Sequence, residues 1–237
     1  MHHHAVYHAE MPVHLEQRDW NGRSLHGKVA LVTGGAGAIG RAVVAQLVAA
    51  GVRVVAVDQA RAPDPATIGV NYLRGDVAHP VTASRAVATA EAAFGGLDLL
   101  VNAASGSHAG GLAEVDLTCW NRVLAVNLTG ALLACQAAVP AMRRRAGGVI
   151  VNLGPVRAIE ASGQRLAYDV SMDAVVALSR HLGPALEPLG IEVHCVLPDA
   201  IPGGDASPDK DIAAAVVELL AGGARRAAEP RPDPAPA

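Results

Sequence analysis

A glycine-rich segment near the start of the chain has the composition and the setting of a phosphate-binding turn. The segment Thr33-Gly34-Gly35-Ala36-Gly37-Ala38-Ile39-Gly40 follows an apolar run, Lys28–Val32, and leads into a helical pattern, Arg41–Ala50. Small residues let the backbone approach a pyrophosphate closely, and the free N–H groups at a helix start stabilise the anion. We therefore predict that this turn binds a dinucleotide through Gly34, Gly35, Ala36, Ala38, Ile39 and Gly40.

Asp58 makes the prediction more specific. It follows the second predicted strand, Val52–Val57, and lies 18 residues after Gly40. A carboxylate at this place accepts hydrogen bonds from the hydroxyl groups of an adenosine ribose and repels a 2′-phosphate. The pattern favours NAD over NADP. The alternative role for Asp58 is a solvated or helix-capping carboxylate.

Strand-like apolar runs alternate with helical patterns along the chain. We predict strands at Lys28–Val32, Val52–Val57, Val70–Leu73, Leu97–Ala103, Val149–Leu153 and Ile191–Leu197. We predict helices at Arg41–Ala50, Val81–Phe94, Leu117–Arg145, Leu166–Leu186 and Asp211–Leu220. This alternation is typical of a parallel sheet with right-handed crossovers. The expected fold class is α/β, with a single doubly wound Rossmann-type sheet in three α/β/α layers.

Length and composition limit the other possibilities. The 237 residues suit one domain, which we place at 27–223, between a flexible N-terminal arm (1–26) and a disordered Pro/Ala-rich tail (224–237). The net charge of −3 gives no sign of nucleic-acid or anionic-membrane binding, and we expect no bilayer-spanning stretch. The three cysteines have neither disulfide nor metal-ligand spacing, so we expect reduced thiols, no metal and a cytoplasmic protein. The positive charges of Arg143-Arg144-Arg145 are expected to complement the partial negative charge at the carboxyl end of a helix.

A series of further motifs follows the glycine-rich turn in order. They are Gly75-Asp76-Val77, Asn102-Ala103-Ala104, Asn127-Leu128-Thr129-Gly130, Val149-Ile150-Val151-Asn152 and Tyr168. Together with Thr33-Gly34-x-x-x-Ala38-x-Gly40 they resemble the short-chain dehydrogenase/reductase family, from about Lys28 to Leu220. The resemblance implies that the cofactor is also contacted by Asp76, Val77, Asn102, Ala103, Ala104 and Pro198. It implies that Asn127 and Tyr168 hold catalytic positions.

The same resemblance shows where catalytic groups are missing. In the family a lysine four residues after the tyrosine assists proton transfer and holds the nicotinamide ribose, and a serine thirteen residues before it hydrogen-bonds the substrate. Here those positions hold Met172 and Pro155. Methionine carries no charge, and proline has neither a hydroxyl nor an N–H group. We therefore expect no standard Ser-Tyr-Lys chemistry, with Asn127 and Tyr168 as remnants and NAD bound weakly or not at all.

The C-terminal part also departs from the family. Pro198-Asp199 stands where the family has Pro-Gly before a long loop over the substrate, and only a short link leads to the last predicted helix. No counterpart of the seventh strand follows Gly223. We expect six strands, with the sixth left at the sheet edge.

Three functions fit this pattern. The first is a catalytically impaired subunit that forms homo-oligomers, or hetero-oligomers with an active paralogue, through the two long helices, with Val126, Ala134, Ala138 and Leu178 as contributors. The second is an atypical NAD(P)H-dependent ketoreductase or dehydrogenase of a small-molecule substrate, with a proton path through water, Asp169, His108 or the substrate. The third is a non-redox reaction or ligand sensing. His108 and Arg157 lie on loops where ligands bind, although solvated loop residues are the more ordinary interpretation.

Overall fold

The computed structural model describes residues 24–61, 69–155, 164–197 and 208–222. Most of the expected arm and tail, together with Arg157 and Pro198, lie outside these ranges. The described chain begins within the segment expected as an arm, and Leu25 is already buried in the core.

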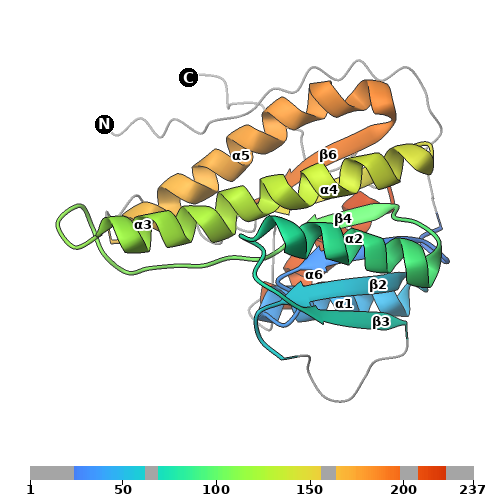
Figure 1. Ribbon diagram of the computed structural model, residues 1–237, viewed down its shortest axis with the longest axis horizontal. Coiled ribbons are helices and arrows are strands. Elements are labelled where there is room, and N and C mark those ends of the chain that lie inside the picture. The colour runs from blue at the N-terminus through green and yellow to red at the C-terminus, as the bar shows by residue number, and fades with distance from the viewer. Residues whose placement is uncertain (1–23, 62–68, 156–163, 198–207, 223–237) are drawn as a thin grey trace, which may run out of the picture.

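Six parallel strands form one sheet, and Figure 1 shows several of them between the helices. They are β1 (Val29–Thr33), β2 (Arg53–Asp58), β3 (Val70–Arg74), β4 (Leu99–Asn102), β5 (Gly148–Leu153) and β6 (Ile191–Val196). Their order is β3-β2-β1-β4-β5-β6, so the order reverses between β1 and β4. In a doubly wound sheet, ligands bind at the carboxyl ends of the strands near this reversal. Among the described residues β6 is an edge strand. The predicted fold class is confirmed.

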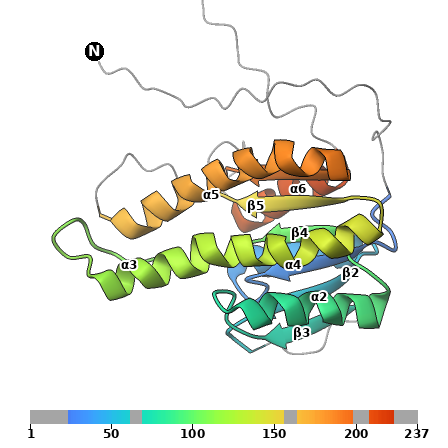
Figure 2. The same cartoon turned by 45° about the horizontal axis from the view of Figure 1, so that its top comes forward.

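Helices cover both faces of the sheet (Figures 1 and 2). They are α1 (Ala38–Ala49), α2 (Pro80–Phe94), α3 (Leu117–Leu124), α4 (Gly130–Arg144), α5 (Leu166–Leu186) and α6 (Pro208–Leu220), with a 3₁₀ turn at Glu187–Leu189. On one face α1 packs against α6, and on the other α2 packs against α4. Helix α5 joins the second layer over β5 and β6. Each face therefore has its own apolar core.

Three predicted boundaries need correction. The fourth strand is shorter than Leu97–Ala103, and it was wrong to treat that run as wholly apolar because it contains Asp98. Helix α6 begins at Pro208, before the predicted start. The helix predicted at Leu117–Arg145 is continuous but contains a π-helical segment, Ala125–Thr129, between α3 and α4.

A row of polar side chains crosses the otherwise apolar sheet near the carboxyl ends of its strands. Thr33 pairs with Asn102 in register, and Asn102 pairs with Asn152. Asn102 Nδ2 donates to Asn152 Oδ1 at 2.8 Å, and Asn152 Nδ2 donates to Ser179 Oγ on α5 at 2.8 Å. Thr33 Oγ1 lies 3.4 Å from Asn102 Oδ1. Because these side chains are buried, their mutual hydrogen bonds offset the cost of removing them from water.

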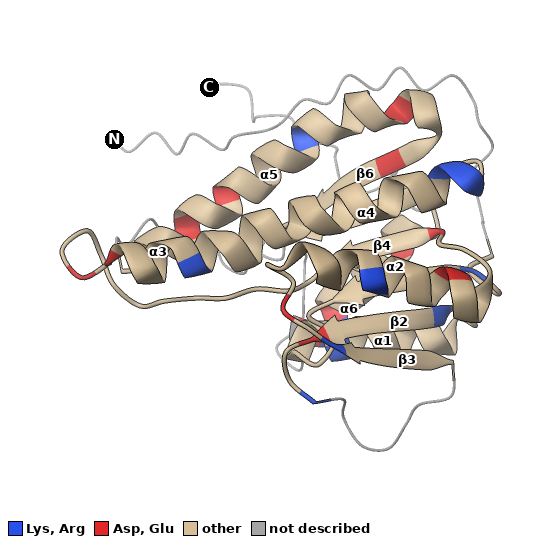
Figure 3. Ribbon diagram, viewed as in Figure 1, with Lys and Arg blue, Asp and Glu red and all other residues tan. Residues whose placement is uncertain are grey.

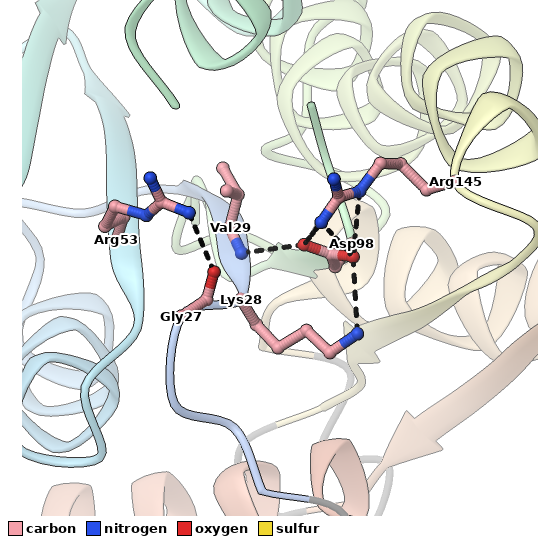
Figure 4. Close-up of polar contacts among 6 residues, drawn as sticks. All are labelled: Gly27, Lys28, Val29, Arg53, Asp98 and Arg145. Atoms are coloured by element: carbon pink, nitrogen blue, oxygen red, sulfur yellow. Dashed lines mark hydrogen bonds and ion pairs between the residues drawn. The ribbon is translucent and has the colours of Figure 1, made fainter. Parts of the chain in front are cut away.

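A second polar cluster lies at the opposite, amino-terminal end of the strands (Figure 4). Asp98, just before β4, is buried, and its carboxylate accepts the Val29 N–H at 2.9 Å. Arg145, after α4, approaches both carboxylate oxygens at 3.3 Å, and Lys28 Nζ lies 3.5 Å from one of them. One carboxylate thus ties together the starts of β1 and β4 and the end of α4.

Candidate nucleotide and active site

The glycine-rich turn lies between the end of β1 and the start of α1, at the carboxyl edge of the sheet. Gly35 N–H donates to Val57 O at 3.1 Å, and Gly37 N–H donates to Gly34 O at 3.0 Å. Gly37 precedes α1, and no side chain caps the helix. The first-turn N–H groups of α1, beginning at Ala38, therefore provide the donors that a phosphate requires.

Close backbone packing explains the glycines of this turn. Gly34 has a φ of +70°, and a Cβ there would lie 2.6 Å from the Cα and N atoms of Ala104. A Cβ at Gly40 would lie 2.0 Å from Gly34 O. The turn thus packs directly on Ala103 and Ala104, the segment after β4 that we predicted at the cofactor. Larger residues would push it away from the sheet.

Gly34→Ala is expected to destabilise the protein by about 2 to 3 kcal/mol, because the left-handed backbone and the overlap with Ala104 both oppose a side chain. Urea unfolding of the purified variant measures this change. Gly183→Ala in α5 is the matched control, since a Cβ there meets nothing within 4 Å. Equal unfolding midpoints for Gly34→Ala and wild type would contradict this account of the turn.

Asp58 is connected to the turn as well as to its own strand. Its Oδ2 accepts the Ala36 N–H at 3.0 Å, and its Oδ1 accepts the Ala60 N–H at 2.9 Å. The helix-capping role considered from the sequence is not what these contacts show, because both N–H groups belong to a turn and a loop and neither belongs to the first turn of a helix. A carboxylate oxygen has further lone pairs after one hydrogen bond, so both oxygens still have acceptor capacity for ribose hydroxyls.

Asp76 and Val77 follow β3 and approach the start of α4. Asp76 accepts Ala78 N–H at 3.0 Å and pairs with Arg122 of α3 at 2.7 Å. Partial burial raises the pKa of Asp76, but the bonds from Arg122 and Ala78 outweigh it, so this pKa lies below its usual value. Gly130 packs on Val77, where a Cβ would lie 3.0 Å from Val77 Cγ2. The ion pair holds this loop against the long helix.

Asn127 lies in the π-helical segment and is buried. Its Oδ1 accepts the Gly106 N–H at 2.6 Å, and its Nδ2 donates to Gly106 O at 2.9 Å and to Ser171 Oγ at 2.8 Å. Ser171 in turn donates to Tyr168 O at 2.7 Å. Asn127 therefore connects the loop after β4 with the start of α5. π-Helical segments are frequent at functional sites.

Tyr168 lies in the first turn of α5, within a small apolar cluster. Tyr168 is 5% exposed and Met172 is 2% exposed, and with Val123 and Ala167 they form one buried group, flanked by Val115 and Trp120. Met172, which we predicted at the position of the family's lysine, thus places an apolar side chain in the same cluster as the tyrosine. Among the described residues, the cation recorded near Tyr168 is Arg165, whose guanidinium carbon lies 4.8 Å from the ring centre.

The remaining predicted residues are placed around this edge of the sheet. Asn102 ends β4 within the polar row, and Pro155 is half-buried just beyond β5. His108 lies on the loop after β4 and is half-buried. Asp169 lies 3.7 Å from Arg165 in an ion pair, so it is not an isolated base.

A cavity of about 180 Å³ lies away from these residues. It is lined by Lys28, Asp98 and Arg145, among others, at the amino ends of β1, β4 and β5. Its charged groups are already paired with one another. It is therefore separate from the predicted nucleotide site.

Sequence reasoning missed Arg165 and Arg122 as parts of this region. Arg165 directly precedes α5 in a non-helical conformation, so helical spacing does not predict its contact with the Tyr168 ring. The pairing of Arg122 with Asp76 joins segments 46 residues apart, and no local pattern predicts it.

The described residues fit only part of a dinucleotide. The glycine turn, the uncapped start of α1 and the Asp58 carboxylate suit an adenosine diphosphate, because they supply N–H donors for phosphate and acceptors for ribose. Met172 supplies no donor for a second ribose, and Pro155 has no donor at all. A bound nicotinamide dinucleotide supplies hydride transfer, and this chain would hold its adenosine half through these groups.

Comparison with known proteins agrees with the geometry. The family described as short chain dehydrogenase matches residues 28–207. The D-threitol dehydrogenase of Mycolicibacterium smegmatis is 35% identical over 185 residues, covering 75% of this chain and 71% of that protein. The 3-alpha-(or 20-beta)-hydroxysteroid dehydrogenase of Mycobacterium tuberculosis is 36% identical over 183 residues, covering 75% of this chain and 70% of that protein.

Solved structures give the same result. A short-chain dehydrogenase/reductase from Serratia marcescens superposes with a TM-score of 0.73 at 33% identity, covering 84% of this chain and 91% of that one. The fold, the order of the motifs and the sequence similarity all agree. This chain belongs to the short-chain dehydrogenase/reductase family.

Proposed function

We propose that the chain is a catalytically impaired member of this oxidoreductase family that works as a subunit, assembled with an active dehydrogenase or reductase. The observation that carries the proposal is Met172, buried beside Tyr168 where the family has its lysine. Without that cation, and without the serine replaced by Pro155, proton transfer loses two of its groups. Positioned acid–base groups contribute about 10²–10⁴-fold to rate.

Purification of the untagged chain from its source tests this proposal. We expect a stoichiometric complex with a paralogue that carries the intact Ser, Tyr and Lys, and little turnover of simple alcohols or ketones by the chain alone. A homo-oligomer with robust turnover would contradict the proposal.

The three free cysteines, Cys119, Cys135 and Cys195, support a cytoplasmic location, because thiols stay reduced in that compartment.

The long helix provides the surface for assembly. The helix Leu117–Arg144 is strongly apolar, yet only 39% of its most apolar stretch is buried. By length and composition alone this helix is apolar enough to cross a membrane, a property that core helices of globular proteins share. It is, however, a helix of the sheet layer, with Ala134 and Ala138 in the core, so these two residues are not interface contributors. The half-buried Leu124, Leu128 and Leu132 recur at four-residue spacing.

We propose that this stripe, with Leu178 and the exposed Val170 of α5, packs against another subunit. Figures 1 and 2 show α4 and α5 side by side on one face, and Figure 3 shows α4 free of charge until Arg143 and Arg144. Burial of an apolar stripe is the main driving force of such interfaces.

Leu132→Asp is expected to weaken the assembly by at least about 30-fold in dissociation constant, since truncating or charging a central interface residue costs about 2 kcal/mol or more. Light scattering over a concentration series measures this change. Ala88→Asp on α2, which is exposed and lies outside the stripe, is the control and should leave the assembly intact. Assembly of Leu132→Asp as tight as that of the wild type, with itself or with the paralogue, would contradict the proposed surface.

Asp58 supports a preference for NAD(H) over NADP(H). Its carboxylate is fixed by Ala36 and Ala60, so a 2′-phosphate on the adenosine ribose would meet a negative charge that cannot easily move away. We expect titration calorimetry to show NADH binding at least about tenfold more tightly than NADPH. Asp58→Ala should remove the preference, and tighter NADPH binding by wild type would contradict this role.

Arg165 supports a second candidate function, an atypical dehydrogenase with a changed proton path. It places a positive charge 4.8 Å from the Tyr168 ring, although from the ring face. Arg165→Met should then abolish native turnover, whereas in an impaired subunit it should leave the activity of the complex unchanged.

A further inference from the structure

The two halves of the nucleotide site are unequally preserved. On the adenosine side, the glycines pack closely enough for the backbone to reach a pyrophosphate, and α1 presents an uncapped amino terminus. Asp58 is held at this turn by two backbone N–H groups. These contacts are made within the described chain and do not depend on a bound ligand, so this half is preorganised.

The nicotinamide side is built differently. The Met172 side chain is enclosed with Tyr168, Ala167 and Val123 and cannot donate a hydrogen bond. The side-chain amide of Asn127 is already hydrogen-bonded to the Gly106 backbone and to Ser171 Oγ. Pro155 offers no donor beyond β5. Arg165, whose guanidinium lies over the Tyr168 ring, forms an ion pair with Asp169 at 3.7 Å and is therefore only partly available to a ligand.

We infer that this site recognises the adenosine diphosphate portion of its ligand alone, and that the physiological ligand class is adenine nucleotides carrying a diphosphate, whether or not nicotinamide is attached. The inference rests on the proposed function, because it takes the same nucleotide site as its basis. It adds that the site does not select a redox cofactor. The bound nucleotide would then serve to stabilise the subunit by binding its folded form.

Titration calorimetry with ADP, ADP-ribose, NAD⁺ and NADH tests the inference on the intact chain. We expect the four dissociation constants to agree within about threefold, because, among the residues that the structure describes, Met172 and Pro155 offer no hydrogen-bond donor to the second ribose or the nicotinamide. ADP should displace NAD⁺ completely, as expected for one shared site.

Met172→Lys provides the complementary test. A charged donor restored at this position should tighten NAD⁺ and ADP-ribose by about tenfold, since a hydrogen bond to a charged group contributes that much, and should leave ADP unchanged. Met172→Leu is the matched control and should change none of the affinities. If the lysine variant fails to fold, the four wild-type affinities still decide the question.

The outcomes separate this inference from the proposed function. NAD⁺ or NADH binding at least about tenfold more tightly than ADP would overturn the inference. Turnover measurements would still decide whether the subunit is impaired. Absence of binding by all four nucleotides would also overturn it, without affecting the assembly test. Equal affinities together with robust turnover would support the inference and contradict the impaired subunit.

Discussion

Met172→Lys combined with Pro155→Ser is expected to raise any trace reductase activity of the chain by about 10²–10⁴-fold, the usual contribution of positioned acid–base groups. The lysine would place a cation in the cluster that now surrounds Tyr168, and the serine would supply a donor just beyond β5. Initial rates of NADH oxidation with a panel of small ketones, at saturating NADH, measure the gain.

The matched control is Met172→Leu with Pro155→Ala, which changes the same two positions without adding a polar group. It should leave the trace rate unchanged. Tyr168→Phe in the unmodified chain, assayed with its partner or natural substrate, is the complementary experiment. If this variant abolishes a robust native activity, Tyr168 is a working acid and the chain is not an impaired subunit.

Asp98→Ala is expected to lower the free energy of unfolding by about 2 to 3 kcal/mol. The substitution leaves the buried Val29 N–H without its acceptor, which costs about 1 to 3 kcal/mol, and it removes the carboxylate shared by Arg145 and Lys28 (Figure 4). Both cations are partly exposed and can turn toward water, so their loss contributes less. Urea unfolding followed by circular dichroism measures the change.

Two further variants separate these contributions. Asp98→Asn keeps an oxygen that can accept the Val29 N–H but removes the negative charge, so its cost should be smaller than that of Asp98→Ala. Lys28→Met removes one partly exposed cation and should cost less than about 1 kcal/mol. An unfolding free energy for Asp98→Ala equal to that of wild type would show that this cluster does not stabilise the sheet.

Much of the fold followed from local patterns in the sequence. Helix α5 occupies the predicted range Leu166–Leu186, because its periodic apolar residues and flanking loops define both ends. The turn at Gly34–Gly40 was recognisable because it joins a strand to a helix. The internal Pro184 did not end α5, since tertiary packing outweighs a single unfavourable residue.

Features that depend on contacts between distant segments were not predictable in the same way. The π-helical segment Ala125–Thr129 has no composition that distinguishes it from regular helix, and it coincides with the Asn127 contacts to Gly106 and Ser171. The faces of α4 were also ambiguous, because small alanines suit both a sheet contact and a subunit contact. Ala134 and Ala138 were consequently assigned to the wrong face.

The polar row at the ends of β1, β4 and β5 bears on how the strands find their alignment during folding. Alternation of apolar and polar residues normally selects one alignment, since a slip by one position exposes the apolar face to water. Here β1, β2 and β4 are apolar on both faces, so a slipped arrangement would bury almost as much apolar surface as the native one. It would, however, move Asn102 away from Asn152 and place an amide in an apolar layer without a partner. These few hydrogen bonds therefore discriminate against misaligned sheets that the hydrophobic effect alone would tolerate, and the two asparagines should change together, if at all, as the chain diverges.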